Sequence, residues 1–299
     1  MNAPRVSLPR VSIGMPVYNG EKHLEQAVDS LLGQTLRDLE LIISDNASTD
    51  RTQEICTAIA ARDRRVRYIR QPRNMGAARN WNIVVEEARG QYFKWASAND
   101  YCAPTMLERC VATLDAEPGV AVCYGRTMLL DDESQPLGEY PFDLEVLDAR
   151  PSVRFKRLVL ELRLNNAQAG MVRLDVLLRT GIERPFPAGD MGLMCELGLY
   201  GGFRRIPELL LYRRMGRESA SRYRTAAELR EFLDPAAPDR RHLVVWQTHW
   251  DYVRSVLRAP IAWSEKFAAL RFIVRSVYWH RTFLWNEVRG RLRPRRAGE

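Results

Sequence analysis

The chain has 299 residues, of which 46% are apolar and 27% are charged, and its formal net charge is +8. These values are typical of a soluble globular protein with a sizeable buried core. No apolar run approaches the about 18 residues needed to cross a bilayer, and the first residues lack the apolar segment of a signal peptide. The composition therefore excludes a membrane-spanning class and predicts a cytoplasmic protein.

The five cysteines show neither C-x-x-C pairs nor a zinc-like spacing with histidine. Their odd number in a long chain favours a reducing compartment over a disulfide framework. His242 and His249 lie seven residues apart in a helical region, and such a pair is more often surface or core histidine than a metal site.

Basic charge is concentrated near the C-terminal end of the sequence. Residues 240–299 hold 13 Lys and Arg against 4 Asp and Glu, so residues 1–239 carry a net charge of −1. Five of the seven tryptophans lie in the same segment. The basic character of the protein therefore belongs to its tail.

Two short apolar runs, 11–15 and 39–44, flank a helical segment over about 21–33. This order predicts two parallel strands joined by a crossover helix. Polar, turn-forming residues follow each run, at 16–20 and at 45–50. Open α/β sheets bind ligands at the carboxyl edge of their strands, so this edge is the candidate active site.

Further helices and strands alternate along the chain. Asp50 is placed to cap the helix that follows it. Apolar periodicity predicts helices over 52–62, 73–90, 104–117, 152–162 and 190–200. It predicts strands over 66–70, 92–96, 120–124 and 128–130. Residues 203–212 are predicted to form a pair of strands joined by a turn at Pro207-Glu208.

Three blocks within the first 50 residues match a known family. They are P-V-Y-N-G at 16–20, S-L-L-G-Q-T at 30–35 and S-D-N-A-S-T-D at 44–50. In this order they closely resemble the amino-terminal half of family 2 glycosyltransferases, the inverting enzymes of the GT-A fold, and the present chain is similar to the non-processive type. The resemblance continues with gaps to about residue 221. It implies an α/β fold with a Rossmann-like, mostly parallel central sheet flanked by helices.

The same resemblance implies the domain organisation. We expect a GT-A catalytic domain over 1–222, with a nucleotide-binding half at 10–104 and an acceptor half at 105–222. The segment D-P-A-A-P-D at 234–239 is typical of a linker, which we assign to 223–239. A basic, Trp-rich helical extension at 240–299 completes the chain.

The family's nucleotide site maps onto named residues here. Pro16 and Tyr18 are expected to frame the base, with the Tyr18 ring as a stacking surface. Asp45 and Asn46 are expected to bind base and ribose. Because Asn46 replaces the family's second acid, Asp45 is the residue expected to take over its contact. Arg79, in the first turn of a helix aimed at the sheet edge, is expected to pair with the diphosphate, since guanidinium matches phosphate oxygens. A solvated arginine is the alternative.

Residues 97–100 depart from the family's D-x-D metal motif. Ser97 and Asn99 stand where two aspartates are expected, and only Asp100 keeps a carboxylate. Mn²⁺ and Mg²⁺ prefer hard oxygen ligands, usually one or two carboxylates plus substrate phosphate. We therefore expect a weakened divalent cation site at Asp100 with Asn99, completed by the diphosphate. A metal-free site that uses arginine side chains, and a purely turn-forming Asp100, are the alternatives.

Residues 165–173 resemble the family segment that passes beneath the donor sugar. Asn166 and Gln168 offer amide groups suited to hydroxyls, and Gly170 would let a sugar approach the backbone closely. A buried strand with a polar start is the alternative interpretation.

Residues 212–221 match the family's Y-R-x-H-x-x-S-x-S ending. Met215 replaces the histidine, which weakens the case for a metal again. Arg213, Arg214 and Ser219 are expected to contact phosphate or sugar from a flexible loop, a lid candidate.

Asp190 is the expected catalytic base. In the family an aspartate, often after a glutamate, begins a helix at this position, and here Gly189 precedes it. An inverting transfer needs one base on the acceptor side, within about 3 Å of the attacking hydroxyl. A second carboxylate acting as covalent nucleophile is not needed. The alternative is that Asp190 only caps its helix.

The tail lies outside the resemblance. Two helices are predicted, over 240–257 and 263–289, and the second carries an apolar stripe that we expect to face the core: Trp263, Phe267, Leu270, Val274, Val277 and Leu284. Arginines alternate with aromatic residues elsewhere on this helix. The tail could pack on the catalytic domain, form a homodimer, or contact the inner face of an anionic membrane.

The sequence thus predicts an inverting hexosyltransferase that moves a sugar from a nucleoside diphosphate, UDP first, to a hydroxyl of a glycan or lipid-linked acceptor in polysaccharide or cell-envelope synthesis. The alternative is a nucleotide-sugar-binding pseudoenzyme, suggested by the altered D-x-D motif. No stretch of the tail resembles a nucleic-acid motif, so no nucleic-acid partner is expected.

Overall fold

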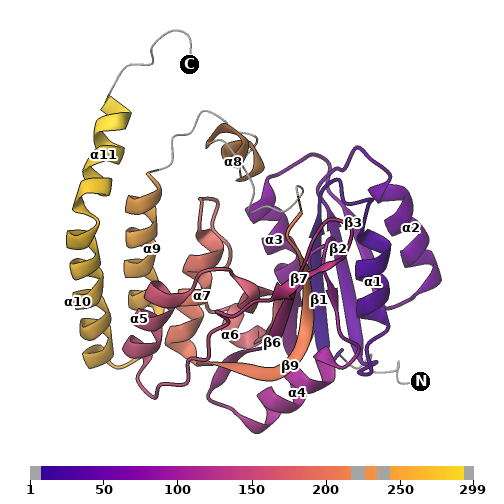
Figure 1. Ribbon diagram of the computed structural model, residues 1–299, viewed down its shortest axis with the longest axis horizontal. Coiled ribbons are helices and arrows are strands. Elements are labelled where there is room, and N and C mark those ends of the chain that lie inside the picture. The colour runs from indigo at the N-terminus through magenta and orange to yellow at the C-terminus, as the bar shows by residue number, and fades with distance from the viewer. Residues whose placement is uncertain (1–7, 217–225, 234, 236–242, 293–299) are drawn as a thin grey trace, which may run out of the picture.

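A computed structural model describes residues 8–216, 226–233, 235 and 243–292. Within these residues, nine strands form one sheet (Figure 1). Eight of them follow one another across the sheet in the order β3 (Val66–Arg70), β2 (Leu39–Asp45), β1 (Val11–Val17), β4 (Tyr92–Trp95), β8 (Met171–Arg173), β6 (Val120–Leu130), β9 (Gly202–Arg214) and β5 (Tyr101–Cys102). The remaining strand, β7 (Pro136–Glu139), pairs with β6.

The first half of the sheet is parallel, as predicted. β1 pairs in parallel with β2, Val11 opposite Leu39, and also with β4, while β2 pairs in parallel with β3. In the second half β8 runs antiparallel to both β4 and β6, so the sheet of the described residues is mixed. The chain reverses there over short connections such as the turn before β7. The carboxyl ends of β1, β2, β3 and β4 therefore share one edge.

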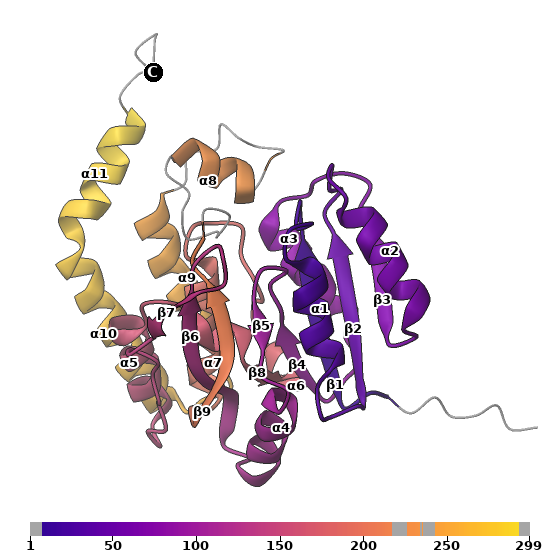
Figure 2. The same cartoon turned by 45° about the vertical axis from the view of Figure 1, so that its right-hand side comes forward.

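Helices cover both faces of this sheet (Figure 2). One buried cluster holds side chains from α1 (Leu24–Leu32), α2 (Thr52–Arg62) and α4 (Met106–Ala116). The other holds side chains from α3 (Ala77–Glu86), α5 (Pro151–Glu161) and α7 (Gly189–Tyr200). All seven residues of β2 are buried, with Leu41 and Ile43 in the first cluster and Ile42 in the second. A strand covered on both faces favours consecutive apolar residues, as in Leu41, Ile42 and Ile43 at the centre of β2.

Gly14 sets how closely α3 approaches the sheet. A Cβ atom at this position would lie 2.6 Å from Val84 Cγ2 on α3 and 2.7 Å from Phe93 Cζ on β4. No side chain fits in that space, so glycine is required by packing rather than by backbone conformation. The close contact fixes α3, and with it the loop before α3, against the carboxyl edge.

Four helices form the C-terminal part of the described chain: α8 (Ala226–Leu233), α9 (Val244–Arg258), α10 (Trp263–Trp279) and α11 (Arg281–Leu292). The segment assigned to a linker, 223–239, contains α8; apart from Pro235, its other residues lie outside the description. α9 and α10 share a core with the catalytic half, since Phe155 of α5 makes edge contacts with Tyr252 (5.4 Å) and Phe272 (6.3 Å). No helix among the described residues combines the length and apolar character needed to cross a membrane.

Two predictions about this region were wrong. The single helix over 263–289 is divided at His280 into α10 and α11. Of the stripe expected to face the core, only Leu284 is buried, whereas Trp263, Phe267 and Val274 are exposed. The buried side of α10 consists of Ala269, Phe272, Ile273 and Ser276. The small residues among these permit close packing on α5 and α9. The helix also carries a second apolar face, and periodicity alone could not tell which of the two faces is buried.

The strand pair predicted over 203–212 was also wrong. β9 is one strand from Gly202 to Arg214, and its register with β6 shifts between the pairs Gly125–Ile206 and Arg126–Leu209. Pro207 and Glu208 therefore form a bulge rather than a turn. Proline has no N–H to give to the ladder, and bulges accept it within a strand.

A buried ion network attaches α9 to α7 and to the loop before α7. Arg184 of that loop pairs with Asp251 of α9 and with Glu196 of α7 (3.5 Å), and Arg258 of α9 also pairs with Glu196 (2.7 Å). Glu196 and Asp251 are only 1% and 3% exposed. Burial raises the pKa of Asp251 to about 6, although Arg184 opposes this.

Asp251 should make stability depend on pH. Its pKa in the folded chain exceeds the value of about 4 expected in the unfolded chain, so the folded state holds this proton more tightly. The free energy of unfolding is therefore expected to fall, by on the order of 3 kcal/mol, as the pH rises from about 4 to about 6. Urea unfolding across this range should show a shallower pH dependence for Asp251→Asn than for the unchanged chain. Parallel pH profiles would contradict the assignment.

Candidate active site

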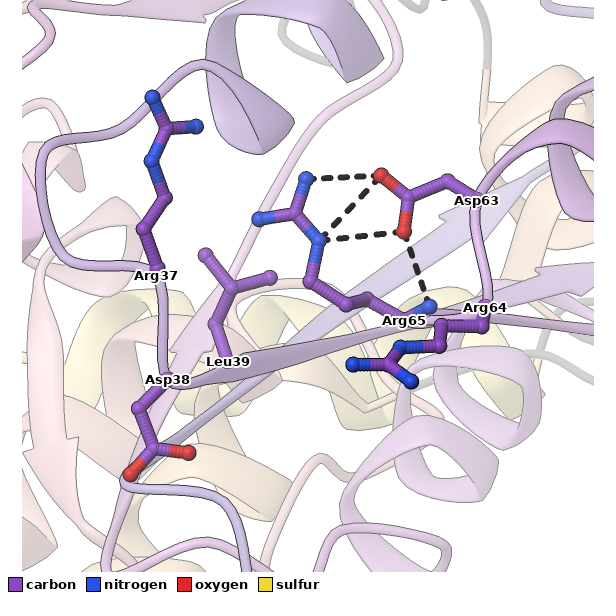
Figure 3. Close-up of a pocket in the computed structure, with 6 residues that line it drawn as sticks. All are labelled: Arg37, Asp38, Leu39, Asp63, Arg64 and Arg65. Atoms are coloured by element: carbon purple, nitrogen blue, oxygen red, sulfur yellow. Dashed lines mark hydrogen bonds and ion pairs between the residues drawn. The ribbon is translucent and has the colours of Figure 1, made fainter.

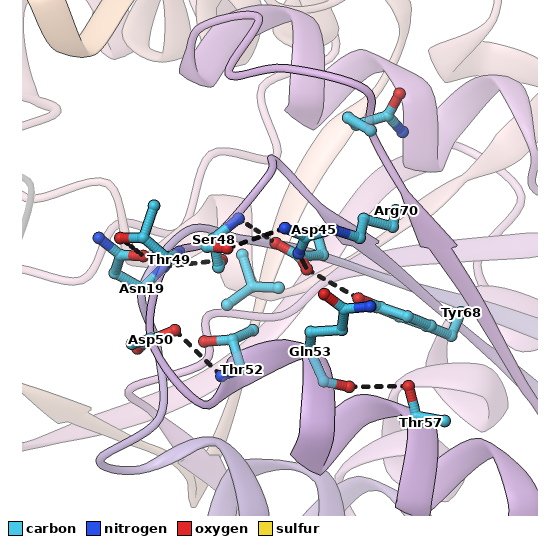
Figure 4. A network of polar contacts seen from close by, with 12 residues as sticks. Asn19, Asp45, Ser48, Thr49, Asp50, Thr52, Gln53, Thr57, Tyr68 and Arg70 are labelled. Atoms are coloured by element: carbon cyan, nitrogen blue, oxygen red, sulfur yellow. Dashed lines mark hydrogen bonds and ion pairs between the residues drawn. The ribbon is translucent and has the colours of Figure 1, made fainter.

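The loops after β1 and β2 lie side by side at the carboxyl edge. The N–H of Asn46 donates to the carbonyl of Val17 (2.9 Å). Asn19 adopts a positive φ of 52°; its Oδ1 accepts the N–H of Thr49 (2.8 Å), and its own N–H donates to Ser48 Oγ (2.9 Å). Figure 4 shows these loops and the polar contacts that join them. Asparagine tolerates the left-handed conformation, so the sequence N-G at this turn suits the geometry.

Asp45 is fully buried at the centre of this network. Its Oδ2 accepts bonds from the Tyr68 hydroxyl (2.7 Å) and from Arg70 (2.6 Å), and its Oδ1 accepts the Ser48 N–H (2.8 Å). Burial, together with Asp45, raises the pKa of Tyr68, which keeps the phenol as a donor. Asp45 therefore fixes the loop after β2. The predicted contact with base or ribose would use only the lone pairs that these three bonds leave free.

Asn46 joins β2 to the loop that precedes α3. Its Oδ1 accepts the Met75 N–H (2.8 Å), and its Nδ2 donates to Asn74 Oδ1 (2.8 Å). Beside it, Pro16 is half-buried near the end of β1 and Tyr18 is 48% exposed. The Tyr18 ring is thus accessible for stacking, whereas Asn19, Asp45 and Asn46 at the same edge are held by hydrogen bonds.

Arg79 lies in the first turn of α3, as predicted, but its guanidinium pairs with Glu86, seven residues further along the same helix. This direction leads away from the sheet edge. About half of the Arg79 side chain is exposed, so contact with a diphosphate would require a different rotamer.

The loop after β4 lies next to the loop after β1. A Cβ on Gly20 would lie 3.2 Å from the Ala98 Cβ. Within this loop Asp100 Oδ1 accepts the Arg214 N–H (2.9 Å), and the Ser97 hydroxyl accepts the Asn99 N–H (3.1 Å). Burial raises the pKa of Asp100, and the positive charges of Arg213, Lys94 and Arg214 act against that rise.

The donor set around Asp100 suits an anion better than a divalent cation. The charges of three cations, Arg213, Lys94 and Arg214, act on the Asp100 carboxylate. Lys94 is 1% exposed and donates to the carbonyls of Trp95 (3.1 Å) and Ala169. Among the described residues no group of three or more His, Cys, Asp or Glu is arranged to hold a metal. A surplus of positive charge opposes Mn²⁺ or Mg²⁺ and attracts a diphosphate. We derive no step that passes through a metal.

Arg213 connects the donor side of the site to its acceptor side. Its charge acts on Asp100, and its Nη1 donates to Asn166 Oδ1 (2.8 Å). Asn166 is 1% exposed in the 3₁₀ turn Asn166–Ala169 and also donates to Asp143 Oδ1 (2.9 Å). Gly170, expected to admit a sugar, instead faces β6: a Cβ there would lie 2.6 Å from the Cys123 carbonyl oxygen. Its predicted sugar contact stays a prediction.

Asp190 is in the first turn of α7, half-buried, and linked to the same 3₁₀ turn. Asn165 Nδ2 donates to Asp190 Oδ2 (3.1 Å) and also lies 3.3 Å from Gln168 Oε1. The Oδ1 atom of Asn165 is buried and has no hydrogen-bond partner within the described part of the chain. Three hydrogen bonds therefore lead from Asp100 to Asp190: Asp100 bonds to the Arg214 N–H, the neighbouring Arg213 bonds to Asn166, and the neighbouring Asn165 bonds to Asp190.

Glu183 is a second carboxylate of this site, and sequence analysis missed it. Its Oε2 accepts Gln168 Nε2 (3.3 Å), and burial, with the nearby charge of Asp190, raises its pKa well above the ordinary value. Asn82 of α3 holds its backbone by donating to the Glu183 carbonyl (2.8 Å) and accepting its N–H (3.0 Å). The sequence does contain a signal for Glu183: it is an acidic residue in a loop rich in glycine and proline, seven residues before Asp190.

Comparison with known proteins finds a family match in the first half of the chain. Residues 12–153 match the sequence profile described as Glycosyl transferase family 2. This segment, a little under half of the chain, is a family 2 glycosyltransferase segment. This confirms the resemblance seen in the blocks at 16–50, and the matched region contains the donor half of the site.

The curated relatives align with this chain over part of its length. An uncharacterized glycosyltransferase of Haemophilus influenzae is 39% identical over 104 residues, 35% of this chain and 42% of that protein. A chondroitin synthase of Pasteurella multocida is 35% identical over 117 residues, 39% of this chain and 12% of that protein. The chain thus spans less than half the length of these curated relatives.

Solved structures show that the fold extends beyond the matched segment. The crystal structure of Staphylococcus aureus TarS 1-349 in complex with UDP has a TM-score of 0.62 and 15% identity, covering 91% of this chain and 73% of that one. At this identity the likeness establishes the GT-A fold alone.

A shallow hollow elsewhere on this glycosyltransferase is not part of the site. Its lining includes Arg37, Arg64 and Arg65 at the amino ends of β2 and β3 (Figure 3). Arg65 bonds to Asp63 there (2.7 Å). Because the strands are parallel, this is the edge opposite to the carboxyl edge. Ser219 of the predicted lid lies outside the described residues.

Proposed function

We propose that this chain is an inverting glycosyltransferase that moves a sugar from a nucleoside diphosphate sugar to a hydroxyl of a glycan or lipid-linked acceptor. The observation that carries the proposal is the series of hydrogen bonds from Asp100 to the Arg214 N–H, from Arg213 to Asn166 and from Asn165 to Asp190. This series supports a cationic donor end and a carboxylate within one connected site. The family 2 match over residues 12–153 supports the reaction class.

On the donor side, the Tyr18 ring would stack on the base beside Pro16, with Asn46 and the remaining lone pairs of Asp45 next to it. The diphosphate would lie over the loop 97–100, where Arg213 and, after a rotamer change, Arg79 supply positive charge. UDP is the first nucleotide to test because TarS, which shares the fold, is described in complex with UDP and with UDP-GlcNAc.

On the acceptor side, Asp190 would act as the general base. Asn165 occupies its Oδ2, which leaves Oδ1 to take a proton from the acceptor hydroxyl. The oxygen of the acceptor hydroxyl then attacks the anomeric carbon of the donor sugar. The bond between that carbon and the diphosphate oxygen breaks, and the diphosphate leaves with the electron pair. Burial and the nearby Asp190 raise the pKa of Glu183, which favours the neutral form of that carboxyl. The Oδ1 of Asn165 is available to accept a bond from a sugar hydroxyl.

A nucleotide-sugar-binding pseudoenzyme is the second candidate, and the altered motif at Ser97, Asn99 and Asp100 favours it. A relative described as a chondroitin synthase and others described as glycosyltransferases support the active enzyme and a role in glycan synthesis. The two candidates differ in turnover, since a pseudoenzyme would bind donor without transferring or hydrolysing its sugar.

A thermal-shift screen of UDP, GDP, dTDP and CDP sugars, each with and without Mn²⁺, tests the donor site. We expect stabilisation by at least one of them that changes little when Mn²⁺ is omitted, because the charge around Asp100 is already positive. In Asn99→Asp the Mn²⁺-dependent part of the shift should grow, as a second carboxylate is added. If stabilisation of the unchanged chain requires Mn²⁺, the metal-free site is overturned. If none of the donors stabilises the chain, the proposed function is overturned.

A further inference from the structure

α10 presents an apolar face to solvent as well as one to the core. Trp263, Phe267, Val274 and Tyr278 are spaced by four, seven and four residues, which places them on one side of the helix. Their exposed fractions lie between 64% and 68%. On α11, Phe283 and Trp285 are also exposed, to 63% and 60%. Exposed aromatic residues gathered on adjacent elements mark an interaction surface rather than a chance distribution.

The exposed charges on the same two helices are positive. Cations stack on four of the exposed rings: Lys266 on Trp263, Arg281 on Tyr278, Arg275 on Trp279 and Arg289 on Trp285. The two acids of the described part of these helices are engaged elsewhere. Glu265 pairs with Arg150 and accepts the Ser152 N–H (3.0 Å), while Glu287 accepts the N–H of Val245 at the start of α9 (2.9 Å).

Both views show α10 and α11 at the edge of the molecule, on the side away from β3 and α2 (Figures 1 and 2). Their inner side is already packed, through Phe272 and Ile273 in the second core cluster and Leu284. The aromatic and basic side therefore serves neither the core nor the site described above.

We propose that the outward side of α10 and α11 binds the headgroup region of an anionic lipid bilayer. Trp and Tyr rings favour the boundary between headgroups and acyl chains, and each Lys or Arg near an anionic surface adds attraction. A second copy of this chain fits less well. A two-fold dimer through this side would bring Arg271, Arg275 and Arg281 of both copies into one interface, where like charges are unfavourable.

Co-sedimentation of the full chain with lipid vesicles tests the proposal independently of any transfer activity. Binding to vesicles containing phosphatidylglycerol should exceed binding to pure phosphatidylcholine by about tenfold or more, and added NaCl should weaken it. Trp263→Ser/Phe267→Ser and, separately, Arg271→Glu/Arg275→Glu should each reduce binding by about tenfold. All four residues are exposed, so folding should persist, and circular dichroism checks this.

Matched substitutions outside the surface serve as controls. Leu178→Ser and Arg64→Glu change exposed residues of the catalytic half and should leave vesicle binding unchanged. Light scattering of the free chain should report a monomer. The proposal is overturned if the chain does not bind anionic vesicles, if the paired variants bind as well as the unchanged chain, or if those variants instead convert a dimer to monomers. Binding to duplex DNA in place of vesicles would also overturn it.

Discussion

Asp190→Asn is expected to lower the turnover number by about 10²-fold or more while donor affinity changes by no more than a few-fold. An amide cannot take the proton of the acceptor hydroxyl, so the attacking oxygen remains a poor nucleophile. The shape of the site should persist, because the amide oxygen can still accept the bond from Asn165 Nδ2. Steady-state transfer assays with saturating donor measure the first quantity, and titration of the nucleotide measures the second.

Asp175→Asn is the matched control for this substitution. Asp175 also lies in the first turn of a helix, α6 (Leu174–Leu177), but it is exposed and makes no contact with the site residues named above. Its turnover should equal that of the unchanged chain. If Asp190→Asn retains full activity, Asp190 is not the base, and Glu183→Gln would then be the variant to examine. With Asp190 as the base, Glu183→Gln should change turnover little, because burial raises the pKa of Glu183 and favours its neutral form, which an amide resembles.

Glu196→Ala is expected to lower the free energy of unfolding by about 3–5 kcal/mol. Glu196 is 1% exposed and pairs with Arg258 (2.7 Å) and Arg184 (3.5 Å), and its Oε2 also accepts the Gly181 N–H (3.1 Å). Removing it breaks both ion pairs between α7 and its surroundings, leaves the mostly buried Arg184 with Asp251 alone of the two acids, and takes away the acceptor of the Gly181 N–H. Arg184 belongs to the loop that carries Glu183 and leads to Asp190, so transfer activity should fall as well. Urea denaturation measures the stability change.

Glu161→Ala provides the comparison for an exposed pair. Glu161 pairs with Arg157 four residues earlier on α5, and 42% of its side chain is exposed. Its loss should cost less than about 1 kcal/mol, because solvent screens such pairs. A Glu196→Ala cost as small as this would show that the extension is not held to the catalytic half by the buried ions.

Local pattern predicted the elements of the donor half accurately. The helix over 52–62 and the strand over 66–70 have the expected bounds, since each is short, bounded by turn residues and matched to its own period. The partners of Asp45 could not be predicted. They come from Tyr68 and Arg70 on the neighbouring strand, and only strand pairing brings them to the same carboxylate.

The acceptor half depends more on tertiary contacts and was predicted less well. Asn166 and Arg213 were identified singly, but their hydrogen bond joins residues 47 positions apart, which no local pattern reports. Glu183 was missed because its role follows from burial near Asp190. On α10, two apolar faces fit the same period, and the packing of α5 and α9 decides which is buried.

The central claim is that a single crevice at the carboxyl edge holds an activated sugar between a cationic loop and one carboxylate. A crystal structure of the chain with a bound nucleoside diphosphate sugar measures this most directly. The diphosphate is expected beside Asp100 and Arg213, with the anomeric carbon facing Asp190. A nucleotide bound elsewhere, for example among Arg37, Arg64 and Arg65 at the opposite edge, or a sugar turned away from Asp190, would contradict it.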